Sequence, residues 1–247
     1  GPLTPRASHF AGKAKAVIHI FAQGAPSHVD TWDPKPSLTQ MHGKSIPGGD
    51  IALGSPFKFS KYGQSGLEVS DLFAKTAAHA DDLAVNRSMW TDIPAHEVAT
   101  VFMNTGSLRI AKPSMGSWLV YGLGTENQNM PAFVVMPDPS GWVKGGAPAW
   151  GNGYMPAAYQ GTILRGGASP ILNLATPAGI SGAQQAATVD FINQLNRENL
   201  AAGEEDSELA ARIAAYELAF RMQQHAPDVV DISRETEATK KLYGLDQ

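Results

Sequence analysis

The sequence predicts an α/β fold with a mainly parallel sheet flanked by helices. Three observations lead to this class: short apolar runs of strand length, helical segments between them, and a helical pattern that continues after Ser181. With 247 residues, the chain is long enough to bury a sizeable core. We expect three apolar runs to be neighbouring strands of one sheet, namely Ala16–Ala22, Leu83–Asn86 and Ala132–Met136.

The predicted helices have recognisable beginnings and ends. Ser70 is a favourable N-cap residue, so a helix is expected to begin there. Further helices are predicted from His96 to Met103 and from Ser114 to Tyr121. After Ser181 the chain is mostly helical, and the last short helix is predicted from Ser233 to Leu242.

These elements suggest three parts. Residues 1–14 form an N-terminal extension, residues 15–180 an α/β core with long loops, and residues 181–247 a helical segment. The chain begins Gly1-Pro2-Leu3 without a methionine, so we expect that a preceding segment has been removed. No apolar stretch approaches the roughly 18 residues needed to span a bilayer, so no transmembrane segment is predicted.

Composition excludes several classes of protein. The chain has 19 Lys and Arg against 23 Asp and Glu, and this net charge of −4 argues against nucleic-acid binding. It has 0 Cys, which excludes disulfides, thiolate metal sites and a cysteine nucleophile.

Candidate chemistry first appears directly after the first predicted strand, where open α/β sheets place their ligands. His28 and Asp30 lie two residues apart, so in extended backbone they project to one side and suit a divalent cation such as zinc or manganese. Ser27 and Thr31 are candidate nucleophiles or hydroxyl ligands. The alternative is an ordered loop in which Asp30 caps a turn and His28 bonds to backbone.

A second group, His96 and Glu97, opens a predicted helix, and both residues are candidate metal ligands. A helix N-terminus favours an anion or a carboxylate at this place. The pair is not a zincin motif, because Thr100 stands where the second histidine would be. The alternative is that His96 and Glu97 only cap the helix.

Motifs spread over nearly the whole chain carry a family resemblance. They are Gly24–Pro36, Lys61–Gly66, Arg87–Asp92, His96–Glu97, Met103–Gly106, Pro113–Trp118, Tyr121–Asn127 and Ala215–Met222. Together they resemble DUF1501, a family of exported bacterial proteins in the sulfatase-like branch of the alkaline phosphatase superfamily. The resemblance implies an alkaline phosphatase or sulfatase-like fold that is incomplete here. The chain would be its N-terminal half, preceded by a twin-arginine export signal and destined for the periplasm or cell surface.

The resemblance also bears on the site. Counted back from Thr105-Gly106, His96 occupies the position of the sulfatase nucleophile, whereas Gln23-Gly24 stands in place of the usual metal-binding aspartates. His28 and Asp30 are therefore expected to supply a shifted metal site, with His96 as a ligand or nucleophile. The alternative is a site that has been remodelled or lost. The missing second half is expected to carry the remaining metal ligands.

Two functions follow from the resemblance. The first is a metal-dependent hydrolase of sulfate or phosphate esters that acts on a small-molecule or glycan ester. Zinc, manganese or calcium would be its ion, and His96, Ser27 and Thr31 its candidate catalytic groups. The second is a non-catalytic binding or cell-surface protein that keeps the fold with a degenerate site.

We also expect the chain by itself to be catalytically silent and to bind a divalent ion weakly or not at all, since too few ligands are present. Self-association through an apolar face or an unpaired strand edge is expected as well.

Overall fold

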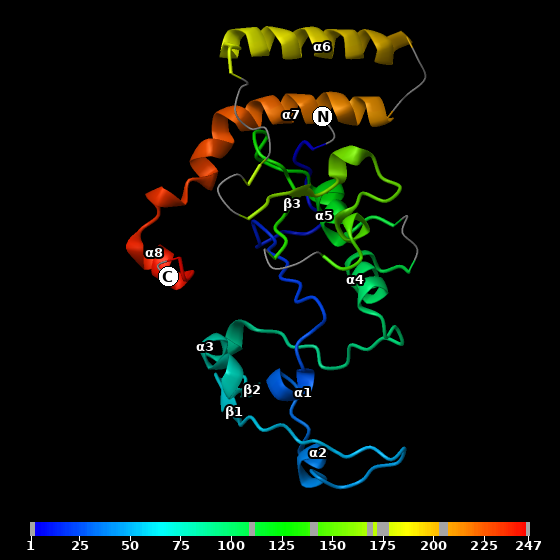
Figure 1. Cartoon of the computed structure of the whole chain (residues 1–247), viewed down its shortest axis with the longest axis vertical. Coiled ribbons are helices and arrows are strands. Elements are labelled where there is room, and N and C mark those ends of the chain that lie inside the picture. The colour runs from blue at the N-terminus through cyan, green and yellow to red at the C-terminus, as the bar shows by residue number, and fades with distance from the viewer. Residues whose placement is uncertain are drawn as a thin grey trace. The chain divides into compact units, whose positions relative to one another are not determined.

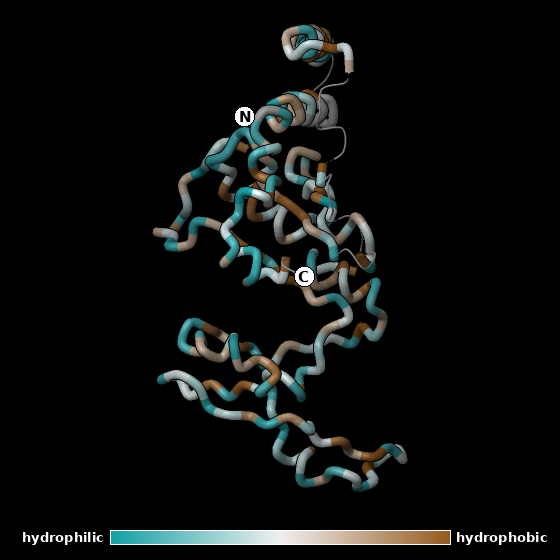
Figure 2. Tube along the Cα trace, turned by 60° about the vertical axis from the view of Figure 1, so that its left-hand side comes forward, coloured by the Kyte–Doolittle hydropathy of each residue, from teal (hydrophilic) through white to brown (hydrophobic). Residues whose placement is uncertain are grey.

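The computed structural model describes residues 3–108, 112–138, 143–166, 170–171, 178–202 and 207–245. The chain divides into two compact units, of which unit 1 comprises residues 1–18 and 95–247 and unit 2 comprises residues 19–94 (Figure 1). Short hydrophobic stretches are separated by hydrophilic ones along the trace of both units (Figure 2). Within the described parts, no helix combines the length and hydrophobicity needed to cross a membrane.

Unit 2 contains a two-stranded antiparallel hairpin. Its strands are β1 (Phe59–Tyr62) and β2 (Leu67–Ser70). Asp81 holds the connecting turn, because its carboxylate accepts the backbone N–H groups of Gln64 at 3.0 Å and Ser65 at 2.8 Å. These two donors, Gln64 first, lower the pKa of Asp81 below its usual value.

The other regular elements of unit 2 are short helices and 3₁₀ turns. They are α1 (His28–Thr31), α2 (Pro36–Gln40), the 3₁₀ turn η1 (Asp71–Phe73), α3 (Ala74–Ala77) and the 3₁₀ turn η2 (Ala80–Asp82). The predicted N-cap at Ser70 is confirmed, since its hydroxyl accepts the N–H of Leu72 at 3.4 Å. Arg87, near the end of the unit, donates to the carbonyl oxygens of Trp32 at 2.8 Å and Glu68 at 3.2 Å.

Unit 1 contains the longer helices. Its elements are α4 (His96–Thr105), α5 (Met115–Leu123), β3 (Val134–Val135), η3 (Ala147–Trp150), η4 (Ala157–Tyr159), β4 (Thr162–Ile163), α6 (Gly182–Ala202), α7 (Ser207–Val230), η5 (Ile232–Arg234) and α8 (Glu237–Leu242). β3 and β4 pair in parallel. The buried residues Val120, Met155 and Tyr159 form a core cluster, against which Leu3 and Phe133 pack.

Helices α6 and α7 lie side by side and occupy the segment for which the sequence predicts helices (Figure 1). α6 begins with a capping box: Ser181 Oγ accepts the N–H of Gln184 at 3.2 Å, and Gln184 Oε1 accepts the N–H of Ser181 at 2.9 Å. The side-chain amide of Gln185 donates to Gln223 across the two helices at 2.7 Å. The helical prediction after Ser181 is therefore confirmed.

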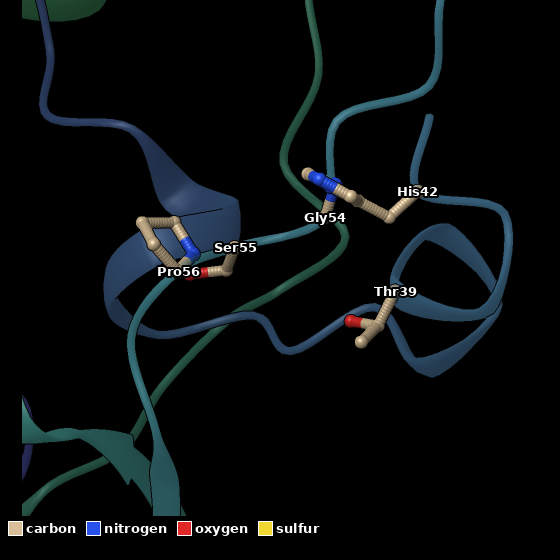
Figure 3. A pocket seen from close by; sticks show the side chains of 5 residues that line it. All are labelled: Thr39, His42, Gly54, Ser55 and Pro56. Carbon is tan, nitrogen blue, oxygen red and sulfur yellow. The ribbon is translucent and has the colours of Figure 1, made fainter. Parts of the chain in front are cut away.

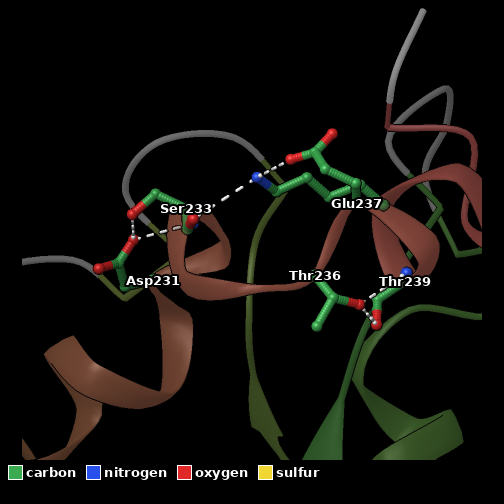
Figure 4. Close-up of polar contacts among 6 residues, drawn as sticks. Asp231, Ser233, Thr236, Glu237 and Thr239 are labelled. Carbon is green, nitrogen blue, oxygen red and sulfur yellow. Dashed lines mark hydrogen bonds and ion pairs between the residues drawn. The ribbon is translucent and has the colours of Figure 1, made fainter.

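Two residues separate the last helix, α8, from a short 3₁₀ turn (Figure 4). Thr236 caps α8, because its hydroxyl oxygen accepts the N–H of Thr239 at 3.1 Å. Before the 3₁₀ turn, the carboxylate of Asp231 accepts from both the backbone and the hydroxyl of Ser233. The predicted helix from Ser233 to Leu242 is thus divided into two capped pieces.

The expected three-stranded sheet is not formed. Of the three apolar runs, only Ala132–Met136 contributes a strand, β3, whose partner is β4. Residues 16–22 and 83–86 have no strand structure, and Ile18 and Ile20 are each 87% exposed. An apolar run becomes a strand only where a neighbour takes its backbone hydrogen bonds, and no described residue pairs with these two runs. The mixture of helices and strands agrees with the α/β class.

Candidate functional site

Helix α4 places His96 and Glu97 at its exposed first turn, as predicted. The N-cap residue, Ala95, has no side-chain acceptor, so no side chain caps the first N–H groups of the helix. One turn further on, the side chain of Thr100 is buried and donates back to the carbonyl oxygen of His96 at 2.8 Å. The helix therefore presents His96 at an N-terminus that is open to solvent.

A loop from later in the chain packs on this turn. A Cβ atom at Gly145 would lie 2.9 Å from the carbonyl oxygen of Glu97 and 2.9 Å from Val101 Cγ2. Gly145 also has a φ of 85°, which L side chains rarely adopt. The close approach brings the preceding residue, Lys144, to His96, and Lys144 Nζ lies 2.9 Å from His96 Nδ1.

The chemistry of this pair follows from its donors. A lysine ammonium has three N–H donors and no acceptor, so His96 Nδ1 must accept and the proton of the neutral ring lies on Nε2. The pair then presents N–H groups beside the uncapped end of α4. Such an arrangement suits an oxyanion. In this arrangement neither ring nitrogen of His96 has a free lone pair for a metal ion or for nucleophilic attack.

The other predicted residues lie on α1 in unit 2. His28 and Asp30 are part of a helical turn, so the expectation from extended backbone is wrong: positions two apart on a helix are rotated by about 200° and do not face each other. Ser27 is the N-cap residue of α1. Thr31 is buried, and its hydroxyl donates to the carbonyl oxygen of Ser27 at 2.8 Å.

Asp30 is held as a carboxylate by its neighbours. The hydroxyl of Ser55 is the main donor and that of Ser27 the second, and together with the positive charge of His28 they outweigh the effect of burial. The pKa of Asp30 is therefore lowered from its ordinary value. A base with a lowered pKa is a weaker proton acceptor, so this environment favours binding over general-base chemistry.

Ser55 also lines a cavity of about 300 Å³, which lies between α2 and the loop beside α1 (Figure 3). The other lining residues are Thr39, His42, Gly54 and Pro56. The ring of His42 is fixed here, because its Nδ1 accepts the N–H of Gly54 at 3.0 Å. The volume lies at the lower end of the range for small-molecule sites, roughly 300–1,000 Å³.

The residues that the structure describes contain no complete ligand set for the predicted metal ion. Within the described ranges, no three His, Asp or Glu side chains gather in a way that could hold a metal ion, whereas a zinc site uses at least three protein ligands. His28 and Asp30 belong to unit 2 and His96 to unit 1, so their convergence stays a prediction. The divalent ion stays a prediction too.

Sequence reasoning missed two residues that the structure brings to these sites. Lys144 reaches His96 across 48 residues of chain, and Ser55 reaches Asp30 from a separate loop. The Gly145-Gly146 pair, which permits the close approach to α4, was the one local signal of a special backbone at Lys144. Nothing in the spacing of Ser55 indicates its partner.

The fold and the site define a mixed helix and strand protein with a candidate oxyanion site at the N-terminus of α4. The chain belongs to the DUF1501 family: the family model described as "Protein of unknown function (DUF1501)" matches residues 14–247. The resemblance to DUF1501 drawn from the motifs is thereby confirmed, and the sulfatase-like branch of the alkaline phosphatase superfamily stays a prediction. No curated protein and no solved structure matches the chain.

Proposed function

We propose that this chain is the N-terminal half of an exported, sulfatase-like hydrolase of sulfate or phosphate esters. The observation that carries the proposal is the contact between Lys144 Nζ and His96 Nδ1 at the first turn of α4. His96 is the residue that the family resemblance places at the nucleophile position of sulfatases. A lysine beside it supports an anionic substrate, because the ester of a sulfate or phosphate carries negative charge.

In this proposal His96 and Lys144 hold the ester group and do not attack it. Their N–H groups and those of the first turn of α4 donate to the ester oxygens. The charge that develops on these oxygens in the transition state is then stabilised in place. The metal ion and nucleophile would come from outside this pair, in line with a site completed by the second half. The periplasm or cell surface is the proposed location.

The alternative is a protein that binds anionic groups without hydrolysing them. The orientation of His96 favours this alternative, because its Nδ1 accepts from Lys144 and its Nε2 carries a proton. Fold alone does not decide between the two functions. Both predict an anion at the same residues, and they differ only in turnover.

Titration calorimetry with inorganic sulfate and phosphate tests the shared claim on the chain itself. Loss of a charge-assisted hydrogen bond weakens binding by about tenfold or more, so Lys144→Met should show this loss. Lys61→Met is the matched control, since Lys61 lies on β1 in unit 2. Equal affinity of both variants and the wild-type chain would contradict the assignment of the site.

Turnover is tested with aryl sulfate and aryl phosphate esters on the polypeptide that includes the second half, with zinc, manganese or calcium. Hydrolysis that falls in Lys144→Met and persists in Lys61→Met supports the hydrolase. Anion binding at Lys144 without hydrolysis of any ester in the panel supports the non-catalytic alternative instead.

A further inference from the structure

Unit 1 carries exposed aromatic residues together on one surface, which we call the aromatic surface. It consists of Trp118 and Tyr121 on α5, Tyr154 on the loop before η4, and the cations Arg6 and Lys112. Trp118 is 46%, Tyr121 42% and Tyr154 61% exposed. Large aromatic side chains that remain this exposed as a group indicate an interaction site.

The rings are fixed by contacts with one another. Trp118 packs edge-on with Tyr121, at a centroid distance of 6.0 Å, and with Tyr154, at 6.3 Å. Tyr121 in turn packs edge-on with the buried Tyr159 at 5.5 Å. Rings held in this way lose little conformational freedom when a ligand binds, so the surface is organised in advance.

Two cations flank the rings. The guanidinium of Arg6 lies 5.1 Å from the centroid of Tyr121, and Lys112 Nζ lies 5.5 Å from the centroid of Tyr154. Arg6 is further fixed by its hydrogen bonds to the carbonyl oxygen of Tyr121 and to the hydroxyl of Tyr159. Positive charge therefore stands at both ends of the row of rings, in a chain whose net charge is −4.

The loop that bears Tyr154 is fastened to α5 at a nearby residue. The N–H of Ser114 and the hydroxyl of Ser117 both donate to the carbonyl oxygen of Gly151 at 3.0 Å, and both serines are buried. The same stretch of chain bears Lys144, which contacts His96 on α4. One segment, residues 143–161, thus supplies a residue to each of the two sites.

We propose that the aromatic surface binds an anionic saccharide, meaning a sugar chain that bears sulfate, phosphate or carboxylate groups. Sugar rings have apolar C–H faces that pack on Trp and Tyr rings, and hydroxyl edges that bond to the Tyr O–H and Trp N–H groups. Arg6 and Lys112 receive the acidic groups. The inference rests on the proposed function and deepens it, since the ester held at His96 and Lys144 would be carried by this saccharide.

A single-stranded nucleic acid is the other ligand that aromatic rings and cations together accept. The charge of the whole chain disfavours it, because nucleic-acid binding gains its affinity from many cations that neutralise successive phosphates. A saccharide with isolated acidic groups needs only the two cations present at the aromatic surface.

Titration calorimetry on the full chain tests the proposal with three probes: a monosulfated disaccharide, the same disaccharide without sulfate, and a 15-nucleotide oligothymidylate. We expect the sulfated sugar to bind tightest. Trp118→Ala should weaken it by about tenfold, because it removes the largest ring of the aromatic surface. Lys112→Gln should reduce its affinity toward that of the neutral sugar. Trp90→Ala, an exposed tryptophan of unit 2, is the matched control and should bind normally.

The variants should keep the thermal midpoint of the wild-type chain, which circular dichroism checks. If Trp118→Ala unfolds, Tyr154→Phe replaces it, because this change keeps the ring and removes only the hydroxyl. Equal binding by Trp118→Ala and Trp90→Ala, tighter binding of the oligonucleotide, or binding of neither sugar at 10 mM would each overturn the proposal. Because the readout is binding, saccharide binding without ester hydrolysis would support this inference while contradicting the hydrolase.

Discussion

The ring of Phe133 lies directly against the Cα of Gly116 in α5. A Cβ atom at Gly116 would approach three carbons of this ring to well under 3.0 Å, a distance that real Cβ contacts essentially never show. Phe133 packs on the buried cluster around Val120 and Tyr159, so it has little room to move. The absence of a side chain at Gly116 thus lets the segment leading to β3 pack on α5.

Gly116→Ala should therefore destabilise the chain by about 1–3 kcal/mol, the usual cost of overpacking a core. Gly122→Ala is the matched control in the same helix, because nothing lies within 4 Å of its added Cβ. It should stabilise the chain by about 0.5–1 kcal/mol through the helix propensity of alanine. Urea unfolding of both variants measures whether each change lowers or raises the free energy of unfolding. A Gly116→Ala protein as stable as Gly122→Ala would contradict the packing described.

Asp81→Ala should destabilise unit 2, because the turn of the β1–β2 hairpin loses the acceptor of two backbone N–H groups. The pKa of Asp81 is lowered in the folded chain, so its contribution is present above the unfolded value, about 3.9, and is lost as pH falls through the folded value. The urea midpoints of unfolding at pH 7 and pH 3 measure how much Asp81 contributes to stability at each pH. The difference between wild type and Asp81→Ala should be larger at pH 7.

Asp82→Ala serves as the control for Asp81→Ala, since it changes the same kind of residue at the neighbouring, exposed position. Its effect on stability should be small and similar at both pH values. If the two variants behaved alike, the hydrogen bonds of Asp81 would not be what holds the turn.

Ser55→Ala should raise the pKa of Asp30 toward its ordinary value, because the hydroxyl of Ser55 is the main cause of the lowered pKa. The second donor, Ser27, remains, so the shift should be partial. Carboxyl carbon chemical shifts of Asp30 followed by NMR between pH 2 and 6 give the midpoint. Ser60→Ala, on β1, is the control and should leave the midpoint unchanged. An unchanged midpoint in Ser55→Ala would contradict the hydrogen bond from Ser55 to Asp30.

Local signals in the sequence predicted local structure well. The cap at Ser70, the beginning of α4 at His96 and the helical stretch after Ser181 depend on contacts within about four residues, and all three agree with the structure. The run from Ala16 to Ala22 was a different kind of prediction, because a strand depends on a partner from elsewhere in the chain. Its composition is that of a strand, and no described residue pairs with it.

The same distinction between local and distant contacts applies to the candidate site. His96 could be singled out from sequence because it opens a helix, whereas its contact with Lys144 depends on a loop that returns after 48 residues. For His28 and Asp30 the error was local. Their predicted relation depends on period 2, the period of extended backbone, but the Pro-flanked segment forms a helical turn.

The hydrogen bond from Arg6 to Tyr159 joins residues that are 153 positions apart. Ribosomes add about 5–20 residues per second, so roughly 8 to 30 s pass between the synthesis of Arg6 and that of Tyr159. Arg6 cannot make this contact until Tyr159 has emerged from the ribosome. Arg6 is thus synthesised well before it can reach its final place.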